Sequence, residues 1–530
     1  MAWSIQSRRA EGDPSAIRVV HDQDLLRPYL EDAAHFPGGH APTLLAPETE
    51  GAVAHALSTT RDLLPIGAQS SLTGGATPFG DVLLSTARLN RIESIASDEV
   101  RLQAGVTLAA LDEEIEKTGR YYPPAPTFAG AFIGGTVATN AAGAATFKYG
   151  TTRDWVRALT VVLPTGDVLD IDRGATRAHP DGYFDLQLAG GSVRVPVPQY
   201  RMPLLPKLSA GYFAARDMDL IDLFIGAEGT LGVVTAVTLG VIPRPTFCLA
   251  FVPFSDRAVA LGCVDRLRQV GHDPRGIDVS AIEHLDRRSL DLVREDGVDR
   301  TSGVRIPSDT VIALLVTLEL PAGMSGAQAF DEIGRALEPG VPDTPLVRFC
   351  RLLGAYEALG SVEIAVPGDR RRMAALLSVR EAVPLAVNQR VGRAKQTVDR
   401  RIGKIAADVI VPFERIETLL ASCGDEFGAR GLDGAVWGHI SDGHLHPNVI
   451  PRSMADAESG AAAVLALGRE AIRLGGSPLA EHGVGRNLVK QQLLAELYGS
   501  TGIEEMRRVK RAIDPDWTLA PGVLFPRSAR

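Results

Sequence analysis

The stretch PIGAQSSLTGG at residues 65–75 follows a short apolar run and carries glycine, serine and threonine in place of bulky side chains. Backbone N–H groups and hydroxyls of such a loop can point toward a bound anion. Two further segments, GGTVATNAAG at 134–143 and GAEGTLG at 226–232, are equally poor in bulk. Glycine and alanine at this density favour close approach of a flat ligand or of another surface to the backbone.

None of these segments matches GxGxxG or GxxxxGK[ST], so neither a Rossmann fold nor a P-loop is indicated. Taken singly, each also fits a tight turn in a β-rich domain, because glycine-rich turns are common. Around them, from about residue 40 to 245, short β-branched runs alternate with glycine-rich turns. That alternation predicts strands with some helices between them.

The character of the chain changes after residue 245, where longer amphipathic stretches alternate with single strands. We expect helices within 257–270, 325–337, 369–388 and 455–474. The change predicts a domain boundary near 246. Residues 1–17 have the composition of a loose polar arm, and residues 172–208, rich in Arg, Gly and Pro, that of a surface excursion.

The chain of 530 residues has 55 basic and 64 acidic side chains, which gives a formal net charge of −9. This balance disfavours nucleic acid as a partner, because phosphate binding requires a basic face. No apolar run reaches the ~18 residues that a membrane-spanning helix needs. Residues 1–17 also lack the apolar stretch of a signal peptide. We therefore expect a cytoplasmic protein that is not integral to a membrane, with peripheral attachment to a membrane left open.

The cysteines are scattered along the chain and form no CxxC pair. They are Cys248, Cys263, Cys350 and Cys423. This spacing predicts no disulfide framework, iron–sulfur cluster or attached haem. If the chain takes electrons from a substrate, they must leave through a bound organic cofactor.

Four of the 11 histidines lie within 44 residues near the C-terminus, in WGHISDGHLHPNV and LAEHGVGRNL. The Asp-Gly pair at 442–443 predicts a two-residue hairpin turn. In that register His439 lies opposite His446 with Cβ atoms roughly 5 Å apart. His444 and Asn448 alternate onto the face of His446. Two imidazoles held in this way suit a divalent metal, although a lone histidine on a strand is more often a plain core or surface residue.

In order and content, the glycine-rich segments resemble the FAD-binding half of the vanillyl-alcohol-oxidase superfamily, which includes glycolate oxidase, D-lactate dehydrogenase and D-2-hydroxyglutarate dehydrogenase. There a P-x-G-G-G-T-S-L-T-G-G loop wraps the pyrophosphate, I-G-G-x-V-A-T-N-A-G-G lines the flavin and F-x-G-x-E-G-T-L-G closes the domain. The resemblance covers roughly residues 40–530. It implies an α+β protein with a PCMH-type FAD-binding fold and a C-terminal α+β substrate or cap domain.

The implied organisation has four parts. An N-terminal arm at 1–39 precedes the FAD-binding domain at 40–245, the substrate domain at 246–504 and a C-terminal segment at 505–530 that returns to the FAD domain. The resemblance also implies which residues contact FAD. They are Ile66, Gly67, Ala68, Gln69, Ser70, Ser71, Thr73, Gly74, Pro124, Thr127, Gly130, Gly134, Gly135, Thr139, Asn140, Gly143, Glu228, Gly229, Gly232 and Val234.

The pyrophosphate loop departs from the family pattern at three places. Ala68, Gln69 and Ser70 stand where relatives usually have Gly, Gly and Thr. The loop also lacks the His or Cys to which some relatives attach the flavin. This implies that FAD is bound non-covalently.

The C-terminal motifs resemble those of metal-dependent D-2-hydroxy-acid dehydrogenases, which carry G-H-x-x-D-G-N-L-H-x-N and a separate E-H-G-x-G. The resemblance implies that His439, His446 and Glu481 hold one divalent metal, zinc or manganese, and that His482 is the catalytic base. His444 stands where the family has Asn. Support for the ligands, contact with the substrate and service as an extra ligand are all open for it.

A carboxylate substrate also needs a fixed cation. Arg380 in SVREAVP and Lys404 in GKIAADVIVP match the family's R-E and K-x-x-x-D-x-x-V-P positions. His444 and Asn448 join them as candidate substrate contacts. In a chain with 55 Lys and Arg most basic side chains are solvated, so a plain surface role is an equal alternative for Arg380 and Lys404.

Together with these residues, the resemblance implies an FAD-dependent enzyme that oxidises a D-2-hydroxy acid of the D-lactate, glycolate or D-2-hydroxyglutarate type to the 2-oxo acid. The metal would polarise the substrate hydroxyl, and His482 would take a proton, with hydride transfer and α-proton removal both open. Reduced flavin would pass its electrons to a quinone, a cytochrome, an electron-transfer flavoprotein or oxygen. The alternatives are a flavin transferase similar to alkyldihydroxyacetonephosphate synthase, which Glu481 disfavours, and a non-catalytic flavin-binding protein.

Overall fold

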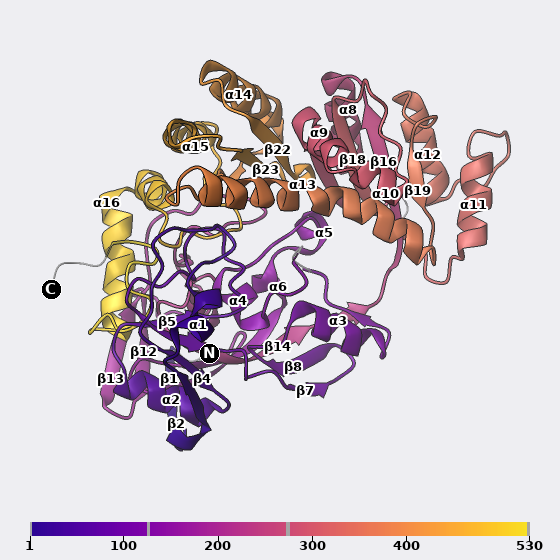
Figure 1. The fold of residues 1–530 in the computed structure, drawn as a ribbon. Helices are drawn as coiled ribbons and strands as arrows, with labels where there is room; N and C mark the ends of the chain where they lie inside the picture. The colour runs from indigo at the N-terminus through magenta and orange to yellow at the C-terminus, as the bar shows by residue number, and fades with distance from the viewer. Residues whose placement is uncertain (1–2, 125–127, 272–275, 527–530) are drawn as a thin grey trace.

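A computed structural model describes residues 3–124, 128–271 and 276–526 (Figure 1). Its N-terminal half is built around a six-stranded antiparallel sheet. The order is β2 (Arg8–Arg9), β11 (Asp167–Asp172), β10 (Val156–Val162), β14 (Val233–Gly240), β8 (Glu99–Gln103) and β7 (Ile92–Ile95). All eight residues of the central strand β14 are buried, as its β-branched composition favours.

A second sheet in this half has four strands. Their order in the sheet is β3 (Ile17–Val20), β4 (Leu44–Pro47), β6 (Val82–Ser85) and β5 (Leu63–Ile66). Strands β4 and β5 both run parallel to β6. The loop at 65–75 therefore leaves the carboxyl end of a buried parallel strand. The helices of this half are α1 (Gln23–Leu26), α2 (Glu50–Thr59), α3 (Leu108–Glu116), α4 (Ile133–Ala138), α5 (Thr146–Tyr149), α6 (Thr152–Trp155) and α7 (Leu220–Phe224).

Two expectations about the N-terminal half are wrong. Residues 3–17, the described part of the expected loose arm, are not loose, because β1 (Ser4–Gln6) pairs with β12 (Tyr183–Leu188), and β2 pairs with β11. Residues 172–208 are not a surface excursion, because β12 and β13 (Gly191–Pro196) form a hairpin. Phe184, Leu186 and Val195 of that hairpin are fully buried. These side chains alternate with polar ones as strands require, but the stretch is short, and the Arg, Gly and Pro residues around it are typical of a surface loop.

The C-terminal half contains an eight-stranded sheet that begins three residues after β15 (Ile242–Pro243). Its order is β19 (Glu363–Ala365), β16 (Thr246–Phe254), β18 (Ile312–Leu320), β17 (Val279–Asp286), β22 (Gly434–His439), β23 (His444–Val449) and β20 (Ile405–Ala406), and β21 (Val409–Ile410) also pairs with β23. With helices and sheets in both halves, the prediction of an α+β protein is confirmed.

Helices cover both faces of this sheet. Alternate residues of β16, such as Cys248 and Leu249, enter two different hydrophobic cores. One core is shared with α8 (Arg257–Val270), α12 (Pro345–Ala355), α14 (Ile416–Ala429) and α15 (Met454–Arg473). The other is shared with α9 (Arg287–Glu295) and α13 (Arg370–Thr397). This half also contains the helices α10 (Val298–Ser302) and α11 (Gly326–Arg335).

The two halves meet along α13 and α16 (Leu488–Ile513). Figure 1 shows α13 lying between the C-terminal sheet and the N-terminal half. After α16 the chain returns to the first half, where Leu63 N donates to Thr518 O at 2.8 Å and Ala520 N donates to Leu63 O at 2.7 Å. Among the described residues, no helix combines the length and apolar character needed to cross a bilayer.

Candidate active site

A cavity of about 310 Å³ opens where the three glycine-rich segments meet. Its walls also include Glu481 and His482 from the C-terminal half. The predicted FAD contacts that line it are Ile66, Gly67, Ala68, Gln69, Ser70, Ser71, Thr73, Gly134, Gly135, Thr139, Glu228, Gly229, Gly232 and Val234. Gly74, Pro124, Gly130, Asn140 and Gly143 lie outside its lining, and Thr127 lies outside the described residues.

The cavity wall has the form of a cradle for a flat group. A Cβ added to Gly135 would meet no heavy atom within 4 Å, so this glycine presents bare backbone to open space. On the other side of α4, Gly134 has no such room, because a Cβ there would lie 2.7 Å from the Cβ of Ala104. One side of the segment is thus packed against the protein and the other is open to the cavity, which fits a bound flavin.

The unusual Gln69 in the pyrophosphate loop has a structural role. Its φ is 56°, the left-handed region that glycine adopts most readily. Its side-chain Nε2 donates to Tyr29 O at 2.9 Å and to Ala76 O at 3.0 Å. These hydrogen bonds connect the loop to Tyr29 and to the residue that follows it, Ala76, and offset the backbone strain that a non-glycine residue carries here.

The E-H-G-x-G loop docks the C-terminal half onto this cradle. Glu228 accepts hydrogen bonds from Val484 N and Gly485 N, both at 2.8 Å. Burial raises the pKa of Glu228 to about 7. Gly485 has a φ of 57°, and a Cβ there would lie 2.3 Å from Thr73 Oγ1 and 2.4 Å from Thr73 O. Only glycine fits at this junction.

Replacing this glycine should loosen the flavin cradle. We expect Gly485→Ala to lower the apparent Tm and to release FAD, because the positive φ alone costs an alanine about 1–2 kcal/mol and the overlap with Thr73 adds to it. Gly428→Ala in α14 is the matched control, since a Cβ there meets nothing within 4 Å. Thermal unfolding and the FAD retained after gel filtration measure both variants. Equal behaviour of the two would show that the junction tolerates a side chain.

The histidine hairpin has a different register from the one predicted. Trp437, not His439, pairs with His446, so the prediction of a two-residue Asp-Gly turn is wrong. A 3-10 turn at Ile440–Asp442, followed by Gly443 with φ 76°, separates the strands. The shift is by two positions, and an even shift leaves every side chain on its predicted face. The rings of His439 and His446 therefore still converge, with centroids 5.4 Å apart.

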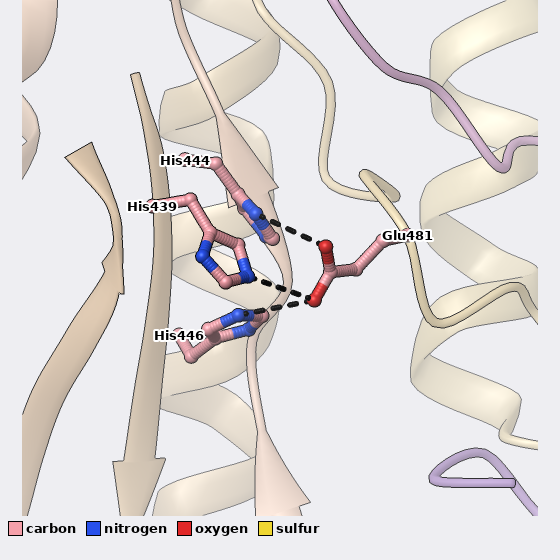
Figure 2. A group of neighbouring side chains, drawn as sticks. All are labelled: His439, His444, His446 and Glu481. Atoms are coloured by element: carbon pink, nitrogen blue, oxygen red, sulfur yellow. Dashed lines mark ion pairs between the residues drawn. The ribbon is translucent and has the colours of Figure 1, made fainter. Parts of the chain in front are cut away.

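Figure 2 shows three imidazoles from this hairpin facing the carboxylate of Glu481. His439 Nε2 and His446 Nε2 lie 3.5 Å and 3.2 Å from Glu481 Oε1. Donor atoms at about 2.1 Å from a tetrahedral metal are separated by roughly 3.4 Å. One donor atom each of His439, His444, His446 and Glu481 falls within 4.8 Å of the others. The residues present therefore fit a divalent metal.

Two buried carboxylates hold these histidines from behind. Glu283 on β17 lies 3.0 Å from His439 Nδ1. Asp408 Oδ1 lies 2.8 Å from His444 Nε2, and Asp408 Oδ2 accepts the backbone N–H groups of residues 480–482 at 2.9–3.1 Å. Carboxylates in this position fix the tautomer and the orientation of metal-binding imidazoles. The sequence offered a signal for Asp408, the acid of the K-x-x-x-D pattern, and none for Glu283.

Lys207, which sequence reasoning missed, also reaches the cluster. Its side chain is fully buried, and Nζ lies 3.2 Å from both Asp442 Oδ2 and Glu481 Oε2. Burial by itself would lower the pKa of Lys207, but the Glu481 and Asp442 carboxylates outweigh it and raise that pKa. Lys207 lies at the end of the segment expected to be a surface excursion, and no local pattern marks it as buried.

His482 lies between the cluster and the cavity. It stacks on His446 with ring centroids 4.8 Å apart and an interplanar angle of 18°. Its Nδ1 is 3.6 Å from Asp408 Oδ1, and its Nε2 is 3.5 Å from Glu481 Oε1. Burial lowers the pKa of His482 to about 3, so the ring is neutral at neutral pH and carries a free lone pair.

The candidate substrate contacts differ in the groups that they already bind within the protein. Arg380 Nε lies 3.1 Å from Glu283 Oε1, and both side chains are buried. Lys404 Nζ donates to the amide oxygen of Asn388 at 2.6 Å; burial and then Lys490 lower the pKa of Lys404 to about 8. Asn448 Nδ2 donates to His446 O at 3.0 Å.

A family model described as "FAD linked oxidases, C-terminal domain" matches residues 245–524, and one described as "FAD binding domain" matches residues 42–172. A D-lactate dehydrogenase of Anaerostipes hadrus is 28% identical over 95% of this chain and 94% of that protein. A mitochondrial D-2-hydroxyglutarate dehydrogenase of Bos taurus is 29% identical over 97% and 82%, and the glycolate oxidase subunit GlcD of Bacillus subtilis is 26% identical over 98% and 94%.

Solved structures of alkyldihydroxyacetonephosphate synthase share the fold. One has a TM-score of 0.60 at 15% identity and covers 96% of this chain and 82% of that chain. At this identity the likeness concerns architecture alone. The predicted type of fold, a PCMH-type FAD-binding domain followed by a C-terminal domain, is confirmed by these matches.

Proposed function

We propose, from the premise that this chain belongs to the FAD-linked oxidase family, that it oxidises a D-2-hydroxy acid to the 2-oxo acid. FAD would be bound non-covalently in the glycine-lined cavity, and one divalent metal would be held by His439, His446 and Glu481. The observation that carries the proposal is the position of Glu481 and His482. Glu481 belongs to the histidine cluster, and both Glu481 and His482 line the glycine-lined cavity.

Bound FAD supplies the acceptor for the two electrons of the oxidation, and a bound divalent metal supplies a Lewis acid for the substrate hydroxyl. The protein's own groups do the rest. His482 faces the cavity as a neutral imidazole and accepts a proton from the substrate. Asp408 fixes the backbone of residues 480–482, so the base and its neighbouring carboxylate are held in one geometry.

Lys404 is the better-supported anchor for the substrate carboxylate. Arg380 already faces the Glu283 carboxylate, whereas Lys404 donates to a neutral amide. Within the part of the chain that the structure describes, no carboxylate forms an ion pair with Lys404. Its charge therefore stays available for an anionic substrate. Arg380, His444 and Asn448 stay candidates for that contact.

An anaerobic titration tests the proposed function. Purified protein should be yellow, and acid precipitation should leave the flavin in the supernatant, because the bond to the protein is non-covalent. D-lactate, D-2-hydroxyglutarate or glycolate should then bleach the bound flavin, and L-lactate and L-2-hydroxyglutarate should bleach it far more slowly. Flavin in the acid pellet would contradict non-covalent binding. Failure of every hydroxy acid to bleach the flavin would contradict the oxidation and favour a transferase or a binding protein.

The electron acceptor belongs to the same proposal. A quinone, a cytochrome, an electron-transfer flavoprotein and oxygen each suit a reduced flavin. Mixing the bleached protein with each acceptor in turn, and following the return of flavin absorbance, ranks them directly.

A further inference from the structure

We propose that His444 is a fourth protein ligand of the metal and binds through Nδ1, so that three imidazoles and one carboxylate hold the metal and the substrate hydroxyl would add as a fifth ligand. The inference rests on the metal in the proposed function. It gives a specific role to the histidine that stands where the family motif has asparagine. Figure 2 shows its ring beside those of His439 and His446, with Nδ1 toward Glu481.

The first argument is the fixed tautomer of His444. Its Nε2 lies 2.8 Å from Asp408 Oδ1, and both side chains are fully buried. Asp408 Oδ2 is occupied by three backbone N–H groups, which leaves Oδ1 to accept from the imidazole. The ring proton therefore belongs on Nε2, and Nδ1 carries a lone pair. A carboxylate behind an imidazole is the arrangement that metal-binding histidines typically have.

The second argument is that Nδ1 of His444 has a lone pair and, within the described part of the chain, no hydrogen-bond donor beside it. In the described residues it is a buried nitrogen without a hydrogen-bond partner, which is costly unless a ligand completes it. It lies 3.7 Å from Glu481 Oε2, and the rings of His444 and His446 are 4.3 Å apart. The nitrogen is thus aimed at the same point as the donor atoms of His439 and His446.

The two other roles for His444 fit these contacts less well. A substrate contact needs a polar atom open to the substrate, yet His444 is fully buried, its Nε2 faces Asp408 and its Nδ1 faces Glu481. A residue that only supports Glu481 would need a proton on Nδ1, but Asp408 already takes the N–H of a neutral ring. Three imidazoles with one carboxylate also favour zinc over manganese, which prefers oxygen ligands.

Counting imidazoles around the metal tests this inference without an activity assay. FAD-loaded wild-type protein, stripped of metal and given one equivalent of Zn²⁺, is measured by X-ray absorption at the zinc edge. Three imidazoles are expected in the wild type and two in His444→Asn. Competition with a chromophoric chelator should show at least about tenfold weaker zinc binding by this variant, by analogy with the loss of groups that support metal ligands.

His284→Asn is the matched control, because His284 is also buried, on strand β17, which pairs with β22. Glu283 contacts His439, so the next residue along the strand faces the opposite side of the sheet. This control should keep three imidazoles and wild-type affinity, and His446→Ala should give the metal-free reference.

Two outcomes would overturn the inference in distinguishable ways. Two imidazoles in wild-type protein, with zinc affinity unchanged in His444→Asn, would overturn the role of His444 and leave the metal of the proposed function in place. No specific zinc binding by wild-type protein would overturn both. The wild-type count needs no variant, so the test holds even if His444→Asn does not fold.

Discussion

His482→Asn is expected to keep FAD and metal and to slow flavin reduction by a D-2-hydroxy acid by about 10²–10⁴-fold, the usual contribution of a general base. Asparagine keeps much of the size and polarity of histidine but has no basic nitrogen. The imidazole stacks on His446 and lines the cavity. Among the described residues, His482 is therefore the basic side chain that contacts both the histidine cluster and the cavity.

Anaerobic stopped-flow measurement of flavin reduction separates this step from reoxidation. Flavin content and zinc content of the variant should match those of the wild type, which shows that the loss is one of proton transfer and not of assembly. A variant that reduces its flavin at the wild-type rate would refute the assignment of His482 as the base.

Lys207→Met is expected to destabilise the metal-free protein by about 3–5 kcal/mol, the usual result of removing one partner of a buried ion pair. In the wild type, Nζ lies 3.2 Å from the buried carboxylate of Asp442 and from that of Glu481, whose side chain is 10% exposed. Without the lysine these acids lose their fixed cation. We therefore expect Zn²⁺ to restore much of the lost stability, because the metal supplies positive charge to Glu481.

Lys510→Met supplies the matched control. Lys510 is also fully buried and pairs with an acid, Asp514, but in α16 and away from the histidine cluster. Its loss should destabilise the protein by a similar amount, and Zn²⁺ should stabilise this variant only as much as it stabilises the wild type, so that the difference between the two remains. The apparent Tm of FAD-loaded, chelator-treated protein with and without Zn²⁺ measures both variants. Equal Zn²⁺ effects on the two would show that Lys207 has a structural role unrelated to the metal.

Local sequence was enough for much of the architecture. The periodicity at 257–270 predicted a helix that the structure contains as α8 (Arg257–Val270). The helix predicted at 455–474 corresponds to α15 (Met454–Arg473). The change of character near residue 246 coincides with the start of β16. Such features can be read from the chain because hydrophobic period and turn chemistry involve neighbours a few residues apart.

The motif-bearing residues were also visible in the sequence. Both C-terminal motifs and the glycine-rich segments are short, so the residue types that they need stand next to one another in the chain and can be recognised there. The face on which His439 and His446 lie was predicted even though their register was not, because a shift of two residues preserves the face of a strand. The turn geometry that set the shift depends on Gly443 and its packing against Val411 O.

Only the tertiary structure placed Lys207, Glu283 and Asp408 around the histidines. They come from segments some 70–200 residues apart in the chain, and apart from the K-x-x-x-D pattern at Asp408 nothing in their neighbours marks them as parts of one buried site. A buried charge is tolerated only where an opposite charge or a metal compensates it, and that partner is set by strand pairing and domain docking. The sequence by itself thus determined the fold and the type of chemistry. The electrostatic frame of the site was decided by long-range contacts, which local sequence patterns do not encode.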